Sequence, residues 1–205
     1  SWLASRASCV MSSIAVRQAR PEDYDLFTRL FPELGIDDPV PTEEHFASSI
    51  APAAFIAMAG DEGAGYIYGR SLRGTGHVVH IIVSPSHRRQ GVGHALMTAL
   101  SQRFADEGLR TWCLNVKPDN HGALALYRRF GFEDAYLSSV LRFDWSLLDG
   151  WPTAPCDAAS STPAASEDAD IEAALGITTG LLESRRQSGD YVLSALRNGE
   201  RWVGA

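Results

Sequence analysis

The sequence predicts a mixed α/β domain followed by a small extension made of a helix and a β-hairpin. Over residues 14–149, strand-like runs alternate with amphipathic helical runs. A run rich in Pro, Ala and Ser follows, and beyond it an Asn-Gly turn lies between two more strand-like runs. With 205 residues, 45% of them hydrophobic, the chain can bury one full domain and a smaller piece.

The first part of the chain predicts a strand and two helices. Residues 14–20 alternate between apolar and polar side chains, as a half-buried strand does. Pro21 sits in a first helical turn, where proline is tolerated, and apolar side chains recur at helical spacing over 26–31. We expect Pro32 to end this helix and Thr42 to cap a short second one.

The next part predicts three strands that supply the core of a sheet. Residues 53–59 and 64–71 flank a turn-forming sequence at 60–63, which indicates a hairpin. Residues 77–83 are rich in β-branched side chains and should form the third strand.

Two helices and further strands complete the main domain. Residues 91–107 carry one apolar face, and Gly108 should end that helix. Residues 109–116 are almost continuously apolar, which is typical of a strand buried on both faces. Residues 120–130 predict a second helix, and 132–145 one or two closing strands.

The composition changes near residue 149, and the remaining segments predict a separate extension. Residues 169–185 have a helical pattern, and strand-like runs at 191–197 and 201–204 flank Asn198-Gly199-Glu200. The predicted organisation is an N-terminal extension at 1–13, the main domain at 14–149, a linker at 150–168 and a C-terminal extension at 169–205. The order of helix, strand, turn and strand makes a partial second copy of the main domain one interpretation of the extension.

Composition excludes several classes of function. The formal net charge is −7, which disfavours bulk electrostatic attraction to nucleic acid or to an anionic membrane. No apolar run reaches the roughly 18 residues that span a bilayer. Cys9, Cys113 and Cys156 lack metal-ligand spacing and are too widely separated for a disulfide framework. We therefore expect a cytoplasmic protein without a metal, a nucleic-acid partner or a membrane partner.

A predicted strand, the loop after it and the start of the next helix together carry a sequence pattern that suits a phosphate ligand. Gly91 and Gly93 lie where the helix at 91–107 begins, so several backbone N–H groups point to one place. Polar and basic residues at 88–90 precede them, and the helix dipole adds positive potential. A dinucleotide-binding Gly-x-Gly-x-x-Gly turn is absent because position 96 is Leu. The natural ligand is a pyrophosphate, and a glycine-rich helix cap without a ligand is the alternative.

A second segment makes the pattern specific. Residues 120–132 read Asn-His-Gly-Ala-Leu-Ala-Leu-Tyr-Arg-Arg-Phe-Gly-Phe. Together the two segments resemble the GCN5-related N-acetyltransferase (GNAT) superfamily over roughly residues 14–145. The first fits its acyl-CoA loop, Arg/Gln-x-x-Gly-x-Gly/Ala, at Arg88, Gly91 and Gly93. The second fits its Asn-x-x-Ala-x-x-Leu-Tyr-x-x-x-Gly-Phe pattern at every defined position.

The resemblance implies a twisted mixed sheet with splayed central parallel strands, flanked by helices, with acetyl-CoA as co-substrate. By position the splayed strands are 77–84 and 110–116. The arm that carries the thioester would enter between them and pair with the strand backbone. The residues that the resemblance assigns to acetyl-CoA are Ile81, Ile82, Val83, Arg88, Arg89, Gln90, Gly91, Val92, Gly93, His94, Ala95, Asn120 and Tyr127.

The implied reaction is acetyl transfer to an amine, and the resemblance gives Tyr127 a role in it. A phenol is protonated at pH 7, so Tyr127 can donate to the departing thiolate of CoA. The alternative is a tyrosine that only packs in the core. Asn120 would contact the pantetheine portion, and it is also placed to cap the following helix.

The proton acceptor is where this sequence departs from part of the family. Members that acetylate the N-terminus of ribosomal proteins typically carry a glutamate on the second splayed strand, and here Asn115 stands at that position. Other members use the first splayed strand, where His80 lies. With an ordinary pKa near 6.5, His80 is a candidate proton acceptor at neutral pH. A strand histidine without a chemical role, or a chain of waters as the base, is the alternative.

The acceptor is not identified by the sequence. In the resembling family the acceptor site includes the loop after the first helix, which here holds Glu33, Asp37 and Asp38. These carboxylates would attract a cationic amine of a small molecule or peptide, or else they are simply solvated. A non-catalytic acyl-CoA-binding regulatory module stays open as an alternative function, and so does a homodimer formed through the C-terminal extension.

Overall fold

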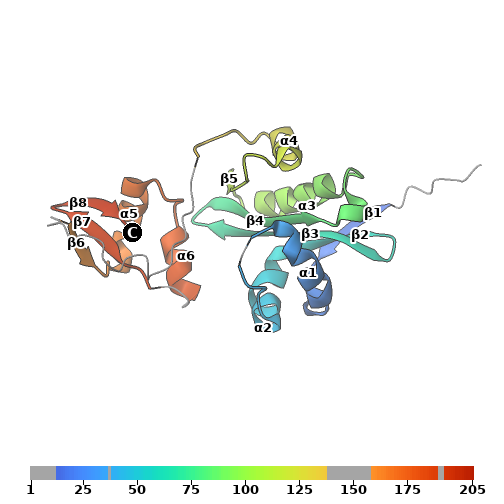
Figure 1. The fold of residues 1–205 in the computed structure, drawn as a ribbon, viewed down its shortest axis with the longest axis horizontal. Coiled ribbons are helices and arrows are strands. Elements are labelled where there is room, and N and C mark those ends of the chain that lie inside the picture. Colours follow the sequence, from blue (N-terminus) through green and yellow to red (C-terminus); the bar gives the residue numbers. More distant parts are fainter. Residues whose placement is uncertain (1–12, 37, 138–157, 189–191) are drawn as a thin grey trace, which may run out of the picture. The chain divides into compact units, whose positions relative to one another are not determined.

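The computed structural model describes residues 13–36, 38–137, 158–188 and 192–205, and its chain divides into two compact units (Figure 1). The first unit runs to Phe130 and the second begins at Gly131. No helix among these described residues is both long enough and apolar enough to cross a bilayer.

The first unit is built on a five-stranded mixed sheet. Its strands lie in the order β1-β2-β3-β4-β5, with antiparallel pairing from β1 to β4 and parallel pairing between β4 and β5. The strands are β1 (Ile14–Gln18), β2 (Ala54–Ala59), β3 (Glu62–Leu72), β4 (Thr75–Val83) and β5 (Thr111–Leu114). This sheet confirms the predicted fold class.

Helices cover both faces of this sheet. Figure 1 shows α3 against one face and α1 with α2 against the other. The helical elements are η1 (Pro21–Asp23), α1 (Tyr24–Leu30), η2 (Phe31–Leu34), α2 (Glu43–His45), η3 (Phe46–Ile50), η4 (Ala51–Ala53), η5 (Pro85–His87), α3 (Val92–Asp106) and α4 (His121–Arg129). Thr42 caps α2 as predicted, because its side chain accepts a hydrogen bond from the His45 N–H at 3.2 Å.

The α-helix α1 ends at Leu30, just before Pro32, as predicted. The chain does not unwind there, because Pro32 is tolerated in the first turn of the 3-10 turn η2, which stops at Gly35, where φ is +61°. Phe31 at the start of η2 is buried in the core, while Glu33 two residues later is exposed. The extra turn therefore carries an acidic side chain beyond the end of α1.

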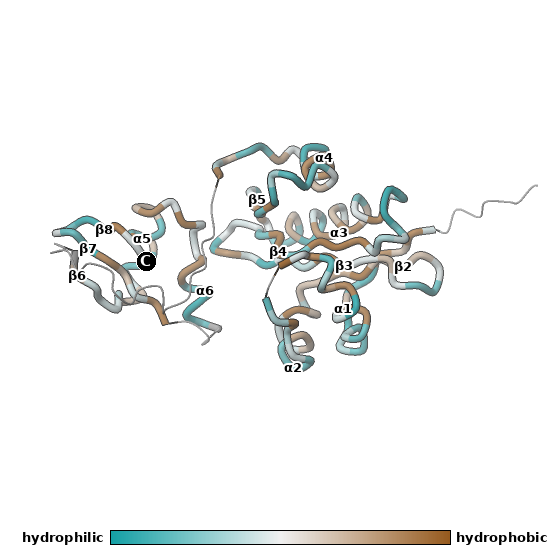
Figure 2. Tube along the Cα trace, viewed as in Figure 1, coloured by the Kyte–Doolittle hydropathy of each residue, from teal (hydrophilic) through white to brown (hydrophobic). Residues whose placement is uncertain are grey.

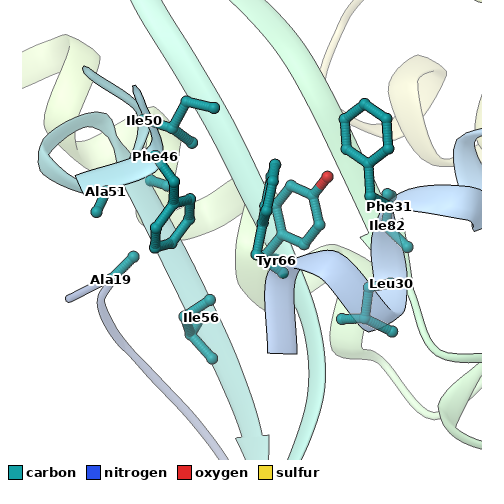
Figure 3. Close-up of a cluster of buried hydrophobic side chains, with 11 residues drawn as sticks. Ala19, Leu30, Phe31, Phe46, Ile50, Ala51, Ile56, Tyr66 and Ile82 are labelled. Carbon is teal, nitrogen blue, oxygen red and sulfur yellow. The ribbon is translucent and has the colours of Figure 1, made fainter. Parts of the chain in front are cut away.

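Aromatic rings from α1, the turn after α2 and β3 form the core on the α1 face. The ring centroid of Phe27 lies 4.7 Å from that of Phe46 and 5.1 Å from that of Tyr66. Figure 3 shows Phe46 and Tyr66 packed with Ile56 and Ile82, side chains that come from three different strands and a helical turn. Figure 2 shows apolar residues concentrated along β3 and β4. Burial of these rings fixes α1 and η2 against the sheet.

The sheet opens between β4 and β5. Tyr68 pairs with His80 and Gly69 with Val78, so Val79 is an extra residue on β4 and forms a bulge. Parallel pairing to β5 begins at Thr75 and ends where Val78 meets Leu114. Within the described ranges, residues 79–83 of β4, its outer half, therefore have no neighbouring strand on the β5 side. This is the splay expected from the family resemblance.

The second unit is a smaller α/β body with its own core. Strands β6 (Ala158–Ser161), β7 (Ala195–Asn198) and β8 (Arg201–Gly204) form an antiparallel sheet in the order β6-β7-β8. Helices η7 (Ala165–Glu167), α5 (Asp168–Leu175) and α6 (Leu181–Ser188) connect β6 to β7. Ile171, Leu182, Ala195 and Trp202 form its buried cluster.

Three details of this part of the chain differ from the sequence-based expectation. Residues 158–161 lie inside the segment predicted as a linker, yet they form β6 because they pair with β7. The helix predicted at 169–185 is two helices, since Gly176 adopts a left-handed φ of +67° and ends α5. No strand forms over 132–137, and the rest of the predicted closing strands lies outside the described residues.

The second unit repeats the element order of the start of the first unit. In each, a strand is followed by a 3-10 turn, two α-helices and two antiparallel strands, and the first unit has the further short turns η2, η3 and η4 between its strands. The 3-10 turns share a detail: the Arg20 N–H donates to the Asp23 carboxylate at 2.8 Å, and the Ala164 N–H donates to the Glu167 carboxylate at 2.9 Å. A partial second copy stays a prediction, which this correspondence supports.

Candidate active site

A cavity of about 700 Å³ lies in the first unit, beside the outer half of β4. Its walls come from the end of β4, from the loop and first turn of α3, and from α4. A volume of this size suits a small-molecule or cofactor site.

The loop before α3 holds a backbone arrangement suited to an anion. Gly91 precedes the helix with a φ of +88°, and Arg89 adopts a φ of +64°, which is uncommon for a residue with a side chain. The Ala95 N–H donates to the Gly91 carbonyl at 3.0 Å and closes the first helical turn. The N–H groups before Ala95 therefore have no carbonyl inside the helix and are available to a ligand.

Gly93 keeps α3 close to the neighbouring helix. A Cβ atom at this position would lie 3.1 Å from Cδ2 of Leu126 and 3.7 Å from Cγ2 of Val83. The first distance is tighter than ordinary van der Waals contact, so a larger residue would press on α4. The second glycine of the predicted loop therefore allows close packing of α3 and α4 as well as close approach of the backbone to a ligand.

Positive charge is concentrated in this cavity although the whole chain is acidic. Arg88, Arg89 and Arg129 line it, and His94 lies among them with its ring 5.1 Å from that of Phe130. Guanidinium groups beside free backbone N–H groups form a strong site for phosphate oxygens. The cavity is therefore suited to a polyanion.

Tyr127 and Asn120 lie at the α4 wall of the cavity. Tyr127 is 7% exposed, and burial raises the pKa of its phenol to about 12. The Asn120 side-chain oxygen accepts a hydrogen bond from the Ala123 N–H at 3.1 Å, which caps α4. The side-chain oxygen of Asn120 therefore caps α4, and the side-chain N–H groups of Asn120 are separate donors at the cavity.

His80 lies outside the lining of the cavity, among aromatic rings on the α1 face of the sheet. Its ring centroid lies 5.6 Å from Phe31, 6.3 Å from Tyr66 and 5.8 Å from Tyr68. Burial among these rings lowers the pKa of His80 from 6.5 to about 4, although Asp38 acts in the opposite direction. Its buried Nδ1 atom has no hydrogen-bond partner within the described part of the chain. The ordinary pKa assumed from the sequence therefore does not apply.

The structure gathers most of the residues that the sequence pointed to. Those that line the cavity are Ile81, Ile82, Val83, Arg88, Arg89, Gly91, Val92, Gly93, His94, Asn120 and Tyr127. Gln90 and Ala95 do not line it; the Gln90 side chain instead donates to the Ser86 carbonyl at 2.9 Å and holds the loop.

Several lining residues come from one face of α4 that was not predicted to belong to the site. They are Gly122, Ala123, Ala125, Leu126 and Arg129. Positions 122, 125, 126 and 129 follow the spacing of one helical face, so the periodicity of this helix was the signal that could have found them.

The turn η2 reaches the cavity through Glu33. The Glu33 carboxylate lies 2.6 Å from the Arg88 guanidinium, whose Nε also donates to the Val83 carbonyl at 3.2 Å. Lys117 donates to the Gly35 carbonyl at 2.7 Å and holds the end of the same turn. Of the two other acidic residues expected near the acceptor, Asp38 is exposed and Asp37 lies outside the described residues.

Residues 21–132 match the model of the acetyltransferase (GNAT) family, and this match covers more than half of the chain. The chain therefore belongs to the GNAT family. Its fold, the splayed strands and the glycine-containing loop before α3 agree with this membership.

Individual relatives are similar over parts of the chain. The chain is 39% identical over 71 residues to the ribosomal protein bS18-alanine N-acetyltransferase of Escherichia coli, a match that spans 35% of this chain and 46% of that protein. It is 34% identical over 89 residues to the mycothiol acetyltransferase of Geodermatophilus obscurus, spanning 43% of this chain and 28% of that protein. The matches thus span less than half the length of these curated relatives.

Solved acetyltransferases share the fold. The structure of the aminoglycoside N-acetyltransferase AAC(6')-Iy with the bisubstrate analogue CoA-S-monomethyl-acetylneamine superposes with a TM-score of 0.55 at 22% identity. The superposition covers 65% of this chain and 99% of that one. At this identity the similarity establishes the architecture and leaves the acceptor open.

Proposed function

We propose that this chain transfers an acetyl group from acetyl-CoA directly to a primary amine of a small molecule or peptide, within a ternary complex. The observation that carries the proposal is one cavity that joins three features: the end of β4 that has no strand on its β5 side among the described residues, a cationic loop at a helix start, and buried Tyr127. Membership of the GNAT family and relatives named as N-acetyltransferases support it.

Backbone groups and arginine side chains of the cavity would bind acetyl-CoA together. Backbone groups at Ile81 and Val83 would pair with the amides of the pantetheine arm, as a neighbouring strand would. The free N–H groups from Arg89 to His94 would bind the pyrophosphate, assisted by the arginines of the cavity. Asn120 would contribute its amide N–H groups to the pantetheine portion.

The amine must lose a proton before or during attack. For an alkyl ammonium with a pKa of about 10.4, deprotonation at pH 7 costs about 4.6 kcal/mol. With a pKa of about 4, His80 is neutral at pH 7 and able to accept a proton, but full transfer from the free ammonium would cost about 9 kcal/mol. Because His80 lies outside the lining of the cavity, it would receive the proton through water, as the attacking nitrogen becomes acidic.

Tyr127 would act on the leaving group. As the new C–N bond forms and the C–S bond breaks, negative charge collects on the CoA sulfur. A phenol with a pKa of about 12 is a weaker acid than a thiol, whose pKa is about 8.5. Tyr127 therefore stabilises the thiolate by donating a hydrogen bond, and the thiolate takes its proton from solvent.

The direct experiment measures release of the CoA thiol from acetyl-CoA against a panel of polyamines, aminoglycosides, amino acids and short peptides. The proposal expects turnover with at least one amine and product acetylated on nitrogen. If acetyl-CoA binds and no amine on the panel is acetylated, the regulatory acyl-CoA-binding module replaces the enzyme as the better function.

The donor site is tested by Gly91→Glu. The new carboxylate would repel the pyrophosphate and block its approach, and we expect calorimetric binding of CoA to be lost. Gly108→Glu is the matched control, because Gly108 also has a positive φ of +75° but is exposed at the far end of α3. CoA affinity that is equal in the two folded variants would contradict the assignment of the loop.

The roles of the second unit and of the cellular setting are also proposals. The repeated element order supports a partial second acetyltransferase-like copy at 158–204. A cytoplasmic location, the lack of a nucleic-acid or membrane partner, and a homodimer through this unit stay predictions.

A further inference from the structure

The ion pair between Glu33 and Arg88 joins the turn after α1 to the loop that precedes the anion site. The two residues are 55 positions apart in the sequence, and both line the cavity. Their side chains are 38% and 53% exposed, so solvent and ligands reach both. Within the described ranges, Arg88 is the cation paired with Glu33.

Arg88 holds Glu33 near the reactive end of the cavity. The guanidinium donates through Nε to the Val83 carbonyl and through a terminal nitrogen to the Glu33 carboxylate. One guanidinium group therefore separates this carboxylate from the open end of β4. A cation that replaced Arg88 beside Glu33 would lie next to the place where the thioester is expected.

A bound pyrophosphate would compete for Arg88. The backbone N–H groups proposed for the pyrophosphate begin at Arg89, the next residue in the chain. A polyanion there attracts the Arg88 guanidinium more strongly than a single exposed carboxylate does, because it carries more charge and more acceptor oxygens. Loss of Arg88 would leave Glu33 as an unpaired carboxylate facing the cavity.

We propose that Glu33 is a specificity-determining residue of the acceptor site, that it binds a cationic group of the acceptor, and that it becomes available when CoA draws Arg88 away. The inference rests on the proposed function and adds to it that binding of the donor and binding of a cationic acceptor are coupled through the ion pair between Glu33 and Arg88.

The test is a binding experiment with a cationic probe and an uncharged probe of the same length, 1,4-diaminobutane and 1,4-butanediol, titrated by calorimetry at low ionic strength with and without saturating CoA. In the wild-type protein, CoA should increase the affinity for 1,4-diaminobutane by about fivefold or more, the lower end of typical coupling between sites. By linkage, 1,4-diaminobutane should increase the affinity for CoA by the same factor. The uncharged 1,4-butanediol should show neither effect.

Two variants isolate the ion pair. In Glu33→Gln, the preference for 1,4-diaminobutane over 1,4-butanediol should be lost, with or without CoA. Arg88→Gln should bind 1,4-diaminobutane without CoA as well as the wild-type protein does with CoA, because Glu33 is then already unpaired. Glu107→Gln is the matched control: Glu107 forms a comparable exposed pair with Arg103 at 2.7 Å outside the cavity, and its variant should keep the diamine preference.

The outcomes separate this inference from the proposed function. If the wild-type protein with CoA does not prefer 1,4-diaminobutane to 1,4-butanediol, or if Glu33→Gln retains the same preference, the role of Glu33 is wrong. If the preference and its dependence on Glu33 appear but no acetyl group is transferred, the proposed catalytic function fails alone. If CoA does not bind, the Arg88→Gln protein still decides the role of Glu33, since that comparison needs no donor.

Discussion

Replacement of His80 should change how the stability of the first unit depends on pH. Burial among Phe31, Tyr66 and Tyr68 lowers the pKa of the folded-state imidazole to about 4, while the unfolded chain should titrate near 6.5. Between these values the unfolded state binds more protons than the folded state. The contribution of neutral His80 to stability is therefore complete well above pH 6.5 and is lost progressively as the pH falls towards 4.

The size of the effect follows from the two pKa values. Each unit of difference corresponds to about 1.4 kcal/mol, so the full loss below pH 4 is about 3 kcal/mol. Between pH 7 and pH 5 the unfolded histidine becomes almost fully protonated while the folded one stays neutral. Over this interval the free energy of unfolding should fall by about 2 kcal/mol because of His80.

The assay is urea unfolding at pH 7 and at pH 5 for the wild-type protein and for His80→Gln, which removes the titrating group. The decrease in unfolding free energy between the two pH values should be about 2 kcal/mol smaller in the variant. His121→Gln, which replaces an exposed histidine at the start of α4, is the matched control and should keep the wild-type difference. An equal decrease in the wild-type and His80→Gln proteins would refute the account of the buried histidine.

Two further predictions concern Tyr127 and the second unit. Tyr127→Phe should lower kcat by about tenfold or more, since it removes a hydrogen bond to a charged group, with CoA affinity nearly unchanged; a variant with wild-type kcat would exclude the leaving-group role. Glu172 is 2% exposed and accepts hydrogen bonds from the N–H groups of Gly180 and Leu182, both at 2.8 Å. Glu172→Gln should therefore speed amide hydrogen exchange over residues 180–188 by about fivefold or more, while Glu200→Gln in an exposed turn should not.

Local patterns were sufficient to predict the fold because each strand and helix of the first unit carries its own signal. The apolar face of α3 and the glycine spacing before it lie within one short stretch of chain. The Asn120 cap and the family pattern in α4 are equally local. Such local patterns do not depend on which segments pack against the helix, so they can be recognised from the sequence alone.

The remaining features depend on contacts between distant segments. Glu33 belongs to the cavity because η2 continues past Pro32 and because Arg88, 55 residues later, meets it. The pKa of His80 is lowered by burial among rings from two other segments, Phe31 of η2 and Tyr66 and Tyr68 of β3. Strand β6 consists of small residues with weak β-propensity and exists through its pairing with β7.

The opening between β4 and β5 affects which amino-acid substitutions the protein can tolerate during evolution. The outer half of β4 presents backbone N–H and C=O groups, which every residue other than proline possesses. Under the proposed function, exchange of Ile81 or Val83 for another apolar residue leaves the atoms that meet acetyl-CoA in place. Glu33, in contrast, would act through its side chain. Substitutions in a short turn can therefore give the protein a new acceptor while the donor site is inherited unchanged.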